Sequence, residues 1–128
     1  MGKRILQILT TGYRGTLEEQ DDQVLWLVHM LHNNGADTDV LLRGSAVNYT
    51  VRGQDARGLT FGDRRQTQPP DLAGEVRALT RKGVRVYVVL DDLKTRGIRR
   101  DDTLEDLAFV PVAELPALLR SYDHVWQW

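Results

Sequence analysis

The chain has 128 residues, with 17 Lys and Arg against 18 Asp and Glu, and it contains no cysteine. This length suits one domain, residues 1–128, that buries a core without cross-links. A formal net charge of −1 excludes, on bulk charge, a strongly basic nucleic-acid binder. The lack of cysteine excludes disulfides, thiol nucleophiles, iron–sulfur clusters and zinc sites built on cysteine.

The apolar run that follows Arg4 is short and is interrupted by Gln7. It therefore fits a buried strand better than the apolar core of a secretory signal. No run approaches the ~20 apolar residues of a membrane-spanning helix. We expect a cytoplasmic protein that binds no membrane.

The first half of the chain alternates between strand and helix patterns. A near-continuous apolar run predicts a buried strand at residues 4–9. A helix is expected at 17–33, with an amphipathic set of apolar residues: Val24, Leu25, Leu27, Val28 and Leu31. A second strand at 38–42 leads into a short helix near 46–51.

The second half opens with a polar, glycine-rich stretch at 53–68, which we expect to be the longest loop. The patterns then predict, in chain order, a helix from Pro69 to Gly83, a strand at 84–90, a loop at 91–98, a short helix at 104–107 capped by Asp102 or Thr103, a strand at 109–110, a helix at 111–120 and a strand at 122–126. This alternation predicts an α/β fold in three layers, a mostly parallel five-stranded sheet with helices on both faces.

Ligands of such sheets bind beyond the carboxyl ends of the strands. We call this edge the rim, and it holds three connections: residues 10–16, 43–48 and 91–97. The first contains Gly12 and Gly15 ahead of a helix, so its backbone N–H groups could hold an anion. It matches no phosphate-loop fingerprint, and a plain strand–helix turn is the competing interpretation.

Three pairs of adjacent carboxylates occur, at Asp21-Asp22, Asp91-Asp92 and Asp101-Asp102. The first suits the start of a helix and the last suits a cap. Asp91-Asp92 alone follows a buried strand at the rim, where carboxylates can bind a hard cation or transfer protons. A solvated loop is the simpler interpretation of that pair.

Other candidate sites are weaker. His29 and His32 lie three apart on the first helix, but no third ligand is placed beside them, so we expect no metal site. No Ser–His–Asp triad can be assembled. Trp126 and Trp128 would share one face of the last strand, either in the core or against another subunit.

Two sequence motifs occur within this order of strands and helices. Each motif alone is a weak signal, but their order and spacing together are more specific. Residues 41–47 read Leu-Leu-Arg-Gly-Ser-Ala-Val, and residues 82–88 read Lys-Gly-Val-Arg-Val-Tyr-Val ahead of Arg-Gly-Ile at 96–98. With the closing segment 114–125, they resemble the DsrE/DsrF-like family of small sulfur-relay proteins, which includes TusD-type and YchN-type proteins. The resemblance covers nearly the whole chain and implies a flavodoxin-like fold and an oligomer, commonly a trimer or hexamer.

The resemblance also implies where the family's chemistry would lie. In active members, a cysteine at the end of the strand before the Arg-Gly element carries a persulfide. Val89 stands at or beside that position, and Ser45 stands where an Asp is usual. Because valine has no thiolate to hold sulfur, the resemblance carries over the fold but not the sulfur transfer.

The family's pocket would then remain without its reactive atom. Its candidate ligand-binding rim consists of Tyr13, Arg14, Arg43, Asn48, Asp91, Asp92 and Arg96. Arg43 and Arg96 could bind an anion through charge-assisted hydrogen bonds. Capping or inter-subunit contacts are the competing interpretation of these residues.

We therefore expect a non-catalytic, DsrE-like binding or scaffold subunit without a cofactor, as a homo-oligomer or beside a cysteine-bearing relative. The alternative is an enzyme or binding protein that acts on a small anionic metabolite or nucleotide at the rim. A nucleic-acid module built on the arginines of 52–65 is least favoured, because Phe61 is the only aromatic residue among them.

Overall fold

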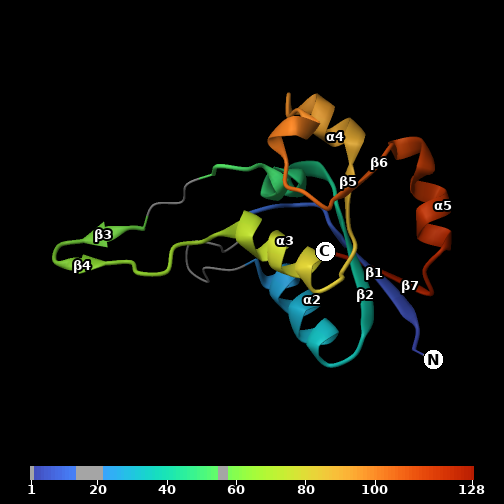
Figure 1. Cartoon of the computed structure of the whole chain (residues 1–128), viewed down its shortest axis with the longest axis horizontal. Coiled ribbons are helices and arrows are strands. Elements are labelled where there is room, and N and C mark those ends of the chain that lie inside the picture. Colours follow the sequence, from blue (N-terminus) through green and yellow to red (C-terminus); the bar gives the residue numbers. More distant parts are fainter. Residues whose placement is uncertain (1, 14–21, 55–57) are drawn as a thin grey trace.

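A computed structural model describes residues 2–13, 22–54 and 58–128. Its main sheet has five strands in the order β6-β5-β2-β1-β7, and all four pairings are parallel (Figure 1). The strands are β1 (Arg4–Leu9), β2 (Asp37–Leu42), β5 (Val86–Val89), β6 (Ala108–Val110) and β7 (His124–Gln127). The predicted mostly parallel five-stranded sheet is confirmed.

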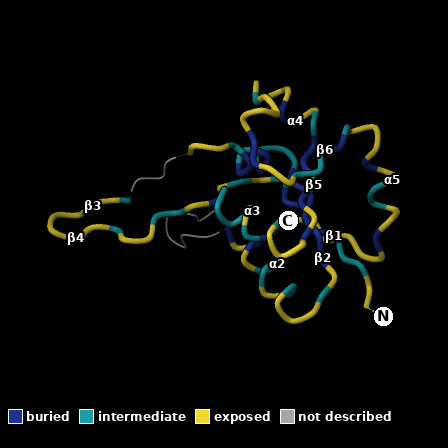
Figure 2. The backbone as a smooth tube through the Cα atoms, in the orientation of Figure 1, coloured by how far each residue is buried: buried dark blue, intermediate teal, exposed yellow. Residues whose placement is uncertain are grey.

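Helices cover both faces of this sheet (Figure 1). On one face lie α2 (Gln23–Asn33) and α3 (Leu72–Arg81), and on the other lies α5 (Leu115–Arg120). Alternate strand residues supply the two cores: Leu6, Ile8 and Leu41 pack toward α5, whereas Leu9, Val40 and Leu42 pack toward α2 and α3. The buried positions in Figure 2 accordingly follow the strands, as expected for a sheet covered on both faces.

A short helix replaces the loop that was expected after β5. Helix α4 (Leu90–Thr95) follows the strand directly, so Asp91 and Asp92 lie in its first turn. Acidic side chains are favourable there because the amino end of a helix carries partial positive charge. Leu93 is fully buried against Val47 and Val88 and fixes this turn on the sheet.

The predicted helix at 104–107 is wrong. A 3-10 turn, η2 (Arg100–Asp102), lies just before it, and the Asp102 carboxylate accepts a hydrogen bond from Arg99 instead of capping a helix. Leu104 donates its N–H to the carbonyl of Thr50, and Asp106 has a positive φ of 63°. The hydrogen bond to Thr50, which is far away in the chain, and the turn at Asp106 hold this segment in a non-helical conformation.

Smaller differences concern where elements begin. The helix expected at 17–33 begins at Gln23 with Asp22 as its N-cap, and the predicted stretch 17–21 lies outside the described residues. The short helix after β2 is a 3-10 helix, η1 (Gly44–Thr50), and a 3-10 turn, η3 (Val112–Glu114), precedes α5. The last strand, which was expected to begin at residue 122, begins at His124. Tyr122 lies before it and is buried in the core.

The stretch expected to be a loop at 53–68 contains an antiparallel ribbon. Strands β3 (Thr60–Phe61) and β4 (Arg64–Arg65) are joined by a two-residue turn in which Gly62 has a positive φ of 60°. The pairing continues where the N–H of Gln66 donates to the carbonyl of Leu59 at 2.8 Å. We call residues 58–68 the arm, and Figure 1 shows it extending away from the sheet and its helices.

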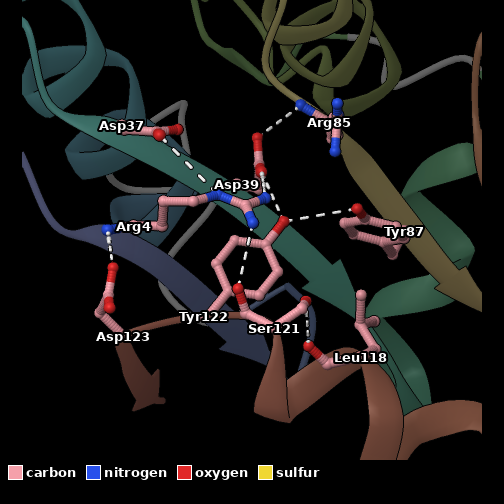
Figure 3. Close-up of polar contacts among 9 residues, drawn as sticks. All are labelled: Arg4, Asp37, Asp39, Arg85, Tyr87, Leu118, Ser121, Tyr122 and Asp123. Atoms are coloured by element: carbon pink, nitrogen blue, oxygen red, sulfur yellow. Dashed lines mark hydrogen bonds and ion pairs between the residues drawn. The ribbon is translucent and has the colours of Figure 1, made fainter.

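A buried carboxylate ties α5 and β7 to the amino end of the sheet (Figure 3). Asp39 on β2 accepts the Tyr122 hydroxyl at 2.5 Å and the N–H of Arg85 at 2.8 Å. The guanidinium of Arg4 lies 4.4 Å from the centroid of the Tyr122 ring and 4.0 Å from the Asp39 carboxylate. Burial, and then the bond to Asp39, raise the pKa of Tyr122, so its hydroxyl remains a neutral donor.

No helix in the described part of the chain has both the length and the hydropathy needed to cross a bilayer.

The Asp39 network predicts unequal effects for two tyrosine substitutions. Tyr122→Phe removes the donor to a buried carboxylate and should lower the free energy of unfolding by about 1–3 kcal/mol. Tyr87→Phe is the matched control, because its hydroxyl lies a long 3.4 Å from that of Tyr122 and should cost less than about 1 kcal/mol. Urea unfolding measures both values, and equal losses would contradict this role for Tyr122.

Candidate functional site

The rim depends on a close approach between the chain segments that follow β1 and β2. Gly44 has a positive φ of 58°, and a Cβ atom placed there would lie 2.5 Å from the carbonyl oxygen of Thr10. The preceding residue, Arg43, donates its N–H to the carbonyl of Leu9 at 3.0 Å. Glycine is therefore required at position 44 both for its backbone angle and for space.

The two carboxylates of α4 are used to hold neighbouring segments. Asp92 Oδ2 accepts the N–H of Gly44 at 2.8 Å, which joins α4 to the segment after β2. Asp91 Oδ1 accepts the N–H of Val112 at 2.9 Å, which joins α4 to the segment after β6. Both side chains that suggested cation binding or proton transfer thus accept backbone hydrogen bonds at the rim.

The segment after β1 uses its backbone donors in the same way. Gly12 donates its N–H to Ser45 Oγ at 2.8 Å, and Tyr13 donates its N–H to the Tyr49 hydroxyl at 2.5 Å. An anion site in this turn would need such N–H groups to point outward. In its described part, residues 10–13, these two N–H groups are instead donated within the protein.

Tyr49 connects this turn to the start of α2. Its side chain is fully buried, and its hydroxyl donates to Asp22 Oδ2 at 2.6 Å. The other oxygen of Asp22 accepts the N–H groups of Val24 and Leu25, so Asp22 is the N-cap of α2. Burial first, and then the bond to Asp22, raise the pKa of Tyr49, which keeps this hydroxyl protonated.

The remaining candidate residues do not converge on one point. Arg43 is half-buried, and its side chain has no hydrogen bond or ion pair with any described residue. Arg96 is exposed at the C-cap of α4. The carbonyl of Asn48 accepts from Gln54 at 2.6 Å, and the Tyr13 hydroxyl donates to the same Gln54 side chain at 2.9 Å. Arg14 lies outside the described residues.

Val89 is fully buried and faces away from α4 and η1. It belongs to the core beneath α5, together with Leu41, Val110 and Leu115. A side chain at this position therefore contacts the interior of the protein and not the surface of the rim.

The histidine pair and the serine at the rim have identifiable contacts. His29 Nδ1 lies 3.1 Å from Lys82 Nζ on α3. In the part of the chain that is described, no three His, Asp or Glu side chains are grouped as a metal would require. Ser45, which stands where the resembling family has an Asp, accepts the N–H of Gly12.

Two surface pockets lie away from these residues. One, of about 460 Å³, lies between α2 and α3 and is lined by residues that include Trp26, Met30, Pro69, Asp71 and Glu75. The other, of about 540 Å³, lies beside η2 and includes Val51, Arg52 and Ile98. Of the candidate ligand-binding rim, none of the residues that the structure describes lines either pocket, whereas His29 of the histidine pair lines the first.

Comparison of the structure with solved structures shows a common fold. The chain is similar to the YchN protein of E. coli, with a TM-score of 0.73 and 20% identity over the whole of both chains. It is also similar to MTH1491, a protein of unknown function from Methanobacterium thermoautotrophicum (TM-score 0.62, 19% identity, 98% and 99% of the two chains). A third similar structure is BT1422, a conserved protein of unknown function from Bacteroides thetaiotaomicron (TM-score 0.65, 16% identity, 97% and 94%).

No family model matches the sequence, and no curated protein matches it. The comparison with solved structures, in contrast, shows a YchN-like, flavodoxin-like α/β fold. Similarity at these identities reports the fold, and function has to be argued from the site itself.

Three residues that organise the rim were not among the sequence-based candidates: Asp22, Ser45 and Tyr49. Asp22 had a usable signal, because an Asp just ahead of an apolar helical pattern is typical of an N-cap. Ser45 and Tyr49 had none, because their partners Gly12 and Asp22 are distant in sequence and are met only once the sheet has formed.

The close approach at Gly44 predicts a position-specific cost of adding a methyl group. Gly44→Ala should destabilise the protein by about 2 kcal/mol more than Gly53→Ala, because only the first places a methyl group against a backbone oxygen. Gly53 is the matched control, since it has a positive φ of 78° and nothing within 4 Å of the added Cβ atom. Equal losses of unfolding free energy for the two variants in denaturant would contradict the close approach of Gly44 to the Thr10 carbonyl.

Proposed function

We propose that this chain is a non-catalytic DsrE-like protein, an oligomeric binding or scaffold subunit that is related to sulfur-relay proteins but carries no persulfide. The observation that carries this proposal is the environment of Val89. At or beside the position where the resembling family holds sulfur on a cysteine, this chain has a fully buried valine in the core under α5.

The rim geometry supports a non-catalytic role. The carboxylates of Asp91 and Asp92 accept backbone N–H groups, and the N–H groups of Gly12 and Tyr13 are donated to side chains. Groups held in this way stabilise the rim. A general acid or base must lie within hydrogen-bonding distance of a substrate proton. These contacts instead direct both carboxylates toward backbone N–H groups of the protein.

Exposed apolar side chains on the edge strand support an oligomer. Val125, Trp126 and Trp128 are 41%, 38% and 44% exposed on or just after β7, which is the last strand of the sheet. Exposed apolar groups on an edge strand favour association with another chain. The partner is a further copy, in a trimer or hexamer, or a cysteine-bearing DsrE-like relative that would supply the missing thiol.

Binding of a small anionic metabolite or nucleotide at the rim is the second candidate. It is favoured by Arg43, whose half-buried guanidinium has no partner among the described residues. It ranks lower because the backbone donors beside Arg43 are already used within the protein.

Restoring a thiol at the position of Val89 tests the proposal. Val89→Cys should give a cysteine that reacts with a disulfide reagent about 100-fold or more slowly than Val112→Cys, because a buried thiol reacts only when the structure opens. Val112 is the matched control, a valine that is 44% exposed. With a sulfur donor, mass spectrometry should detect no added sulfur on the folded Val89→Cys protein.

Rapid labelling of Val89→Cys, or ready transfer of sulfur to it, would contradict the proposal. The site would then still be competent for sulfur transfer and would lack only its thiol.

A further inference from the structure

The two most exposed large apolar side chains in the described part of the chain lie at separate places. Phe61, at the tip of the arm, is 72% exposed, and Trp26, on α2, is 53% exposed. Trp26 lines the pocket of about 460 Å³ between α2 and α3, together with Met30, which is 36% exposed. An aromatic tip and an apolar pocket are therefore both uncovered on the same chain.

The hairpin of the arm is held together by few backbone pairings. Its two strands contain two residue pairs, Thr60 with Arg65 and Phe61 with Arg64. An isolated two-stranded hairpin is at best marginally stable in water. Figure 2 shows the arm as largely exposed along its length, so a contact that buries its tip would stabilise it.

The charges of the tip and the pocket are complementary. Because paired residues of a ribbon point to the same side, Phe61 and Arg64 form one face that is both aromatic and cationic. The pocket is lined by two carboxylates beside its apolar wall: Asp71, whose Oδ1 accepts the N–H of Gly74, and Glu75, whose Oε2 accepts the N–H of Asp22. Its one lysine, Lys82, reaches toward Asn33 and His29 of α2.

We propose that the arm of one copy docks into the α2–α3 pocket of a second copy of this chain. Phe61 then packs against Trp26 and Met30, and Arg64 faces the carboxylates of Asp71 and Glu75. This inference rests on the proposed oligomeric function and names a contact that pairs two copies within the oligomer.

The position of the pocket makes the contact reciprocal. Gln68 and Pro69, at the base of the arm, line the pocket, and the arm leads away from it (Figure 1). From Phe61 to Gln68 an extended strand spans about 23 Å at ~3.3 Å per residue. Two copies related by a two-fold axis across their arms would therefore place each tip at the other's pocket, as an isologous interface requires.

The absence of cysteine allows a direct test by cross-linking. Differently tagged chains carrying Asp63→Cys and Ala78→Cys are co-expressed and treated with a short bismaleimide. Asp63 is next to the tip, and Ala78 lines the pocket. A link between the two tagged chains is expected, and replacing Ala78→Cys by Val112→Cys, at an exposed site outside the pocket, should abolish it.

A substitution at the tip of the arm distinguishes the arm contact from the proposed oligomeric function as a whole. Phe61→Ser should remove the cross-link and weaken self-association, measured by light scattering, about 100-fold, because the contact occurs twice in each pair. Trp26→Ser should have the same effect. Circular dichroism checks that both variants remain folded.

The outcomes are distinguishable. A wild-type protein that is strictly monomeric at micromolar concentration overturns both the arm contact and the homo-oligomer, and the proposed function would then require a complex with a cysteine-bearing relative. A wild-type oligomer that shows no link between positions 63 and 78, or whose mass is unchanged by Phe61→Ser, overturns the arm contact alone.

Discussion

The close passage of Gly44 over the Thr10 carbonyl is the constraint on which the carboxyl end of the sheet depends. It brings the segments after β1 and β2 together, with a Cβ atom at position 44 excluded by a distance of 2.5 Å. The same glycine donates its N–H to Asp92, so α4 is attached at this point as well. Three strands thus end in one connected set of hydrogen bonds, to which Ser45 and Tyr49 add Gly12 and Tyr13.

This arrangement explains how a fold shared with YchN can be kept while its rim serves stability. Buried polar groups must have hydrogen-bond partners, and here the partners come from the protein itself. Val89 contributes an apolar side chain to the core under α5. The features that would make a reactive site, a thiol and outward donors, are replaced by packing and by internal hydrogen bonds. The proposed association with other chains rests on the exposed apolar groups of β7.

The sequence was informative where the local pattern alone decides the structure. Near-continuous apolar patterns predicted β1 and β5, because strands buried on both faces need apolar residues at nearly every position. Short elements escaped prediction: β3 and β4 have two residues each, and α4 has a polar first turn that resembles a loop. The helix expected at 104–107 failed because backbone contacts with Thr50 hold that segment in another conformation.

The candidate site was predictable in location but not in its contacts. Asp91 and Asp92 were correctly placed next to β5, and the backbone groups that they accept, Gly44 and Val112, come from segments far away in the chain. No hydrophobic periodicity in the sequence predicts these contacts, because they form only once the strands have paired. The charged residue types suggested a binding site, and the geometry assigns Asp91 and Asp92 to the connections between strands.

Amide hydrogen exchange at Gly12, Tyr13 and Gly44, followed by NMR, tests most directly whether the rim donors are used within the protein. These three amides should exchange as slowly as those of β2, since each is donated to a side-chain oxygen of the protein. Their exchange should be unchanged by inorganic phosphate or by a nucleotide. Rapid exchange that slows when either anion is added would contradict this internal use of the rim donors and would identify the rim as an open anion-binding site.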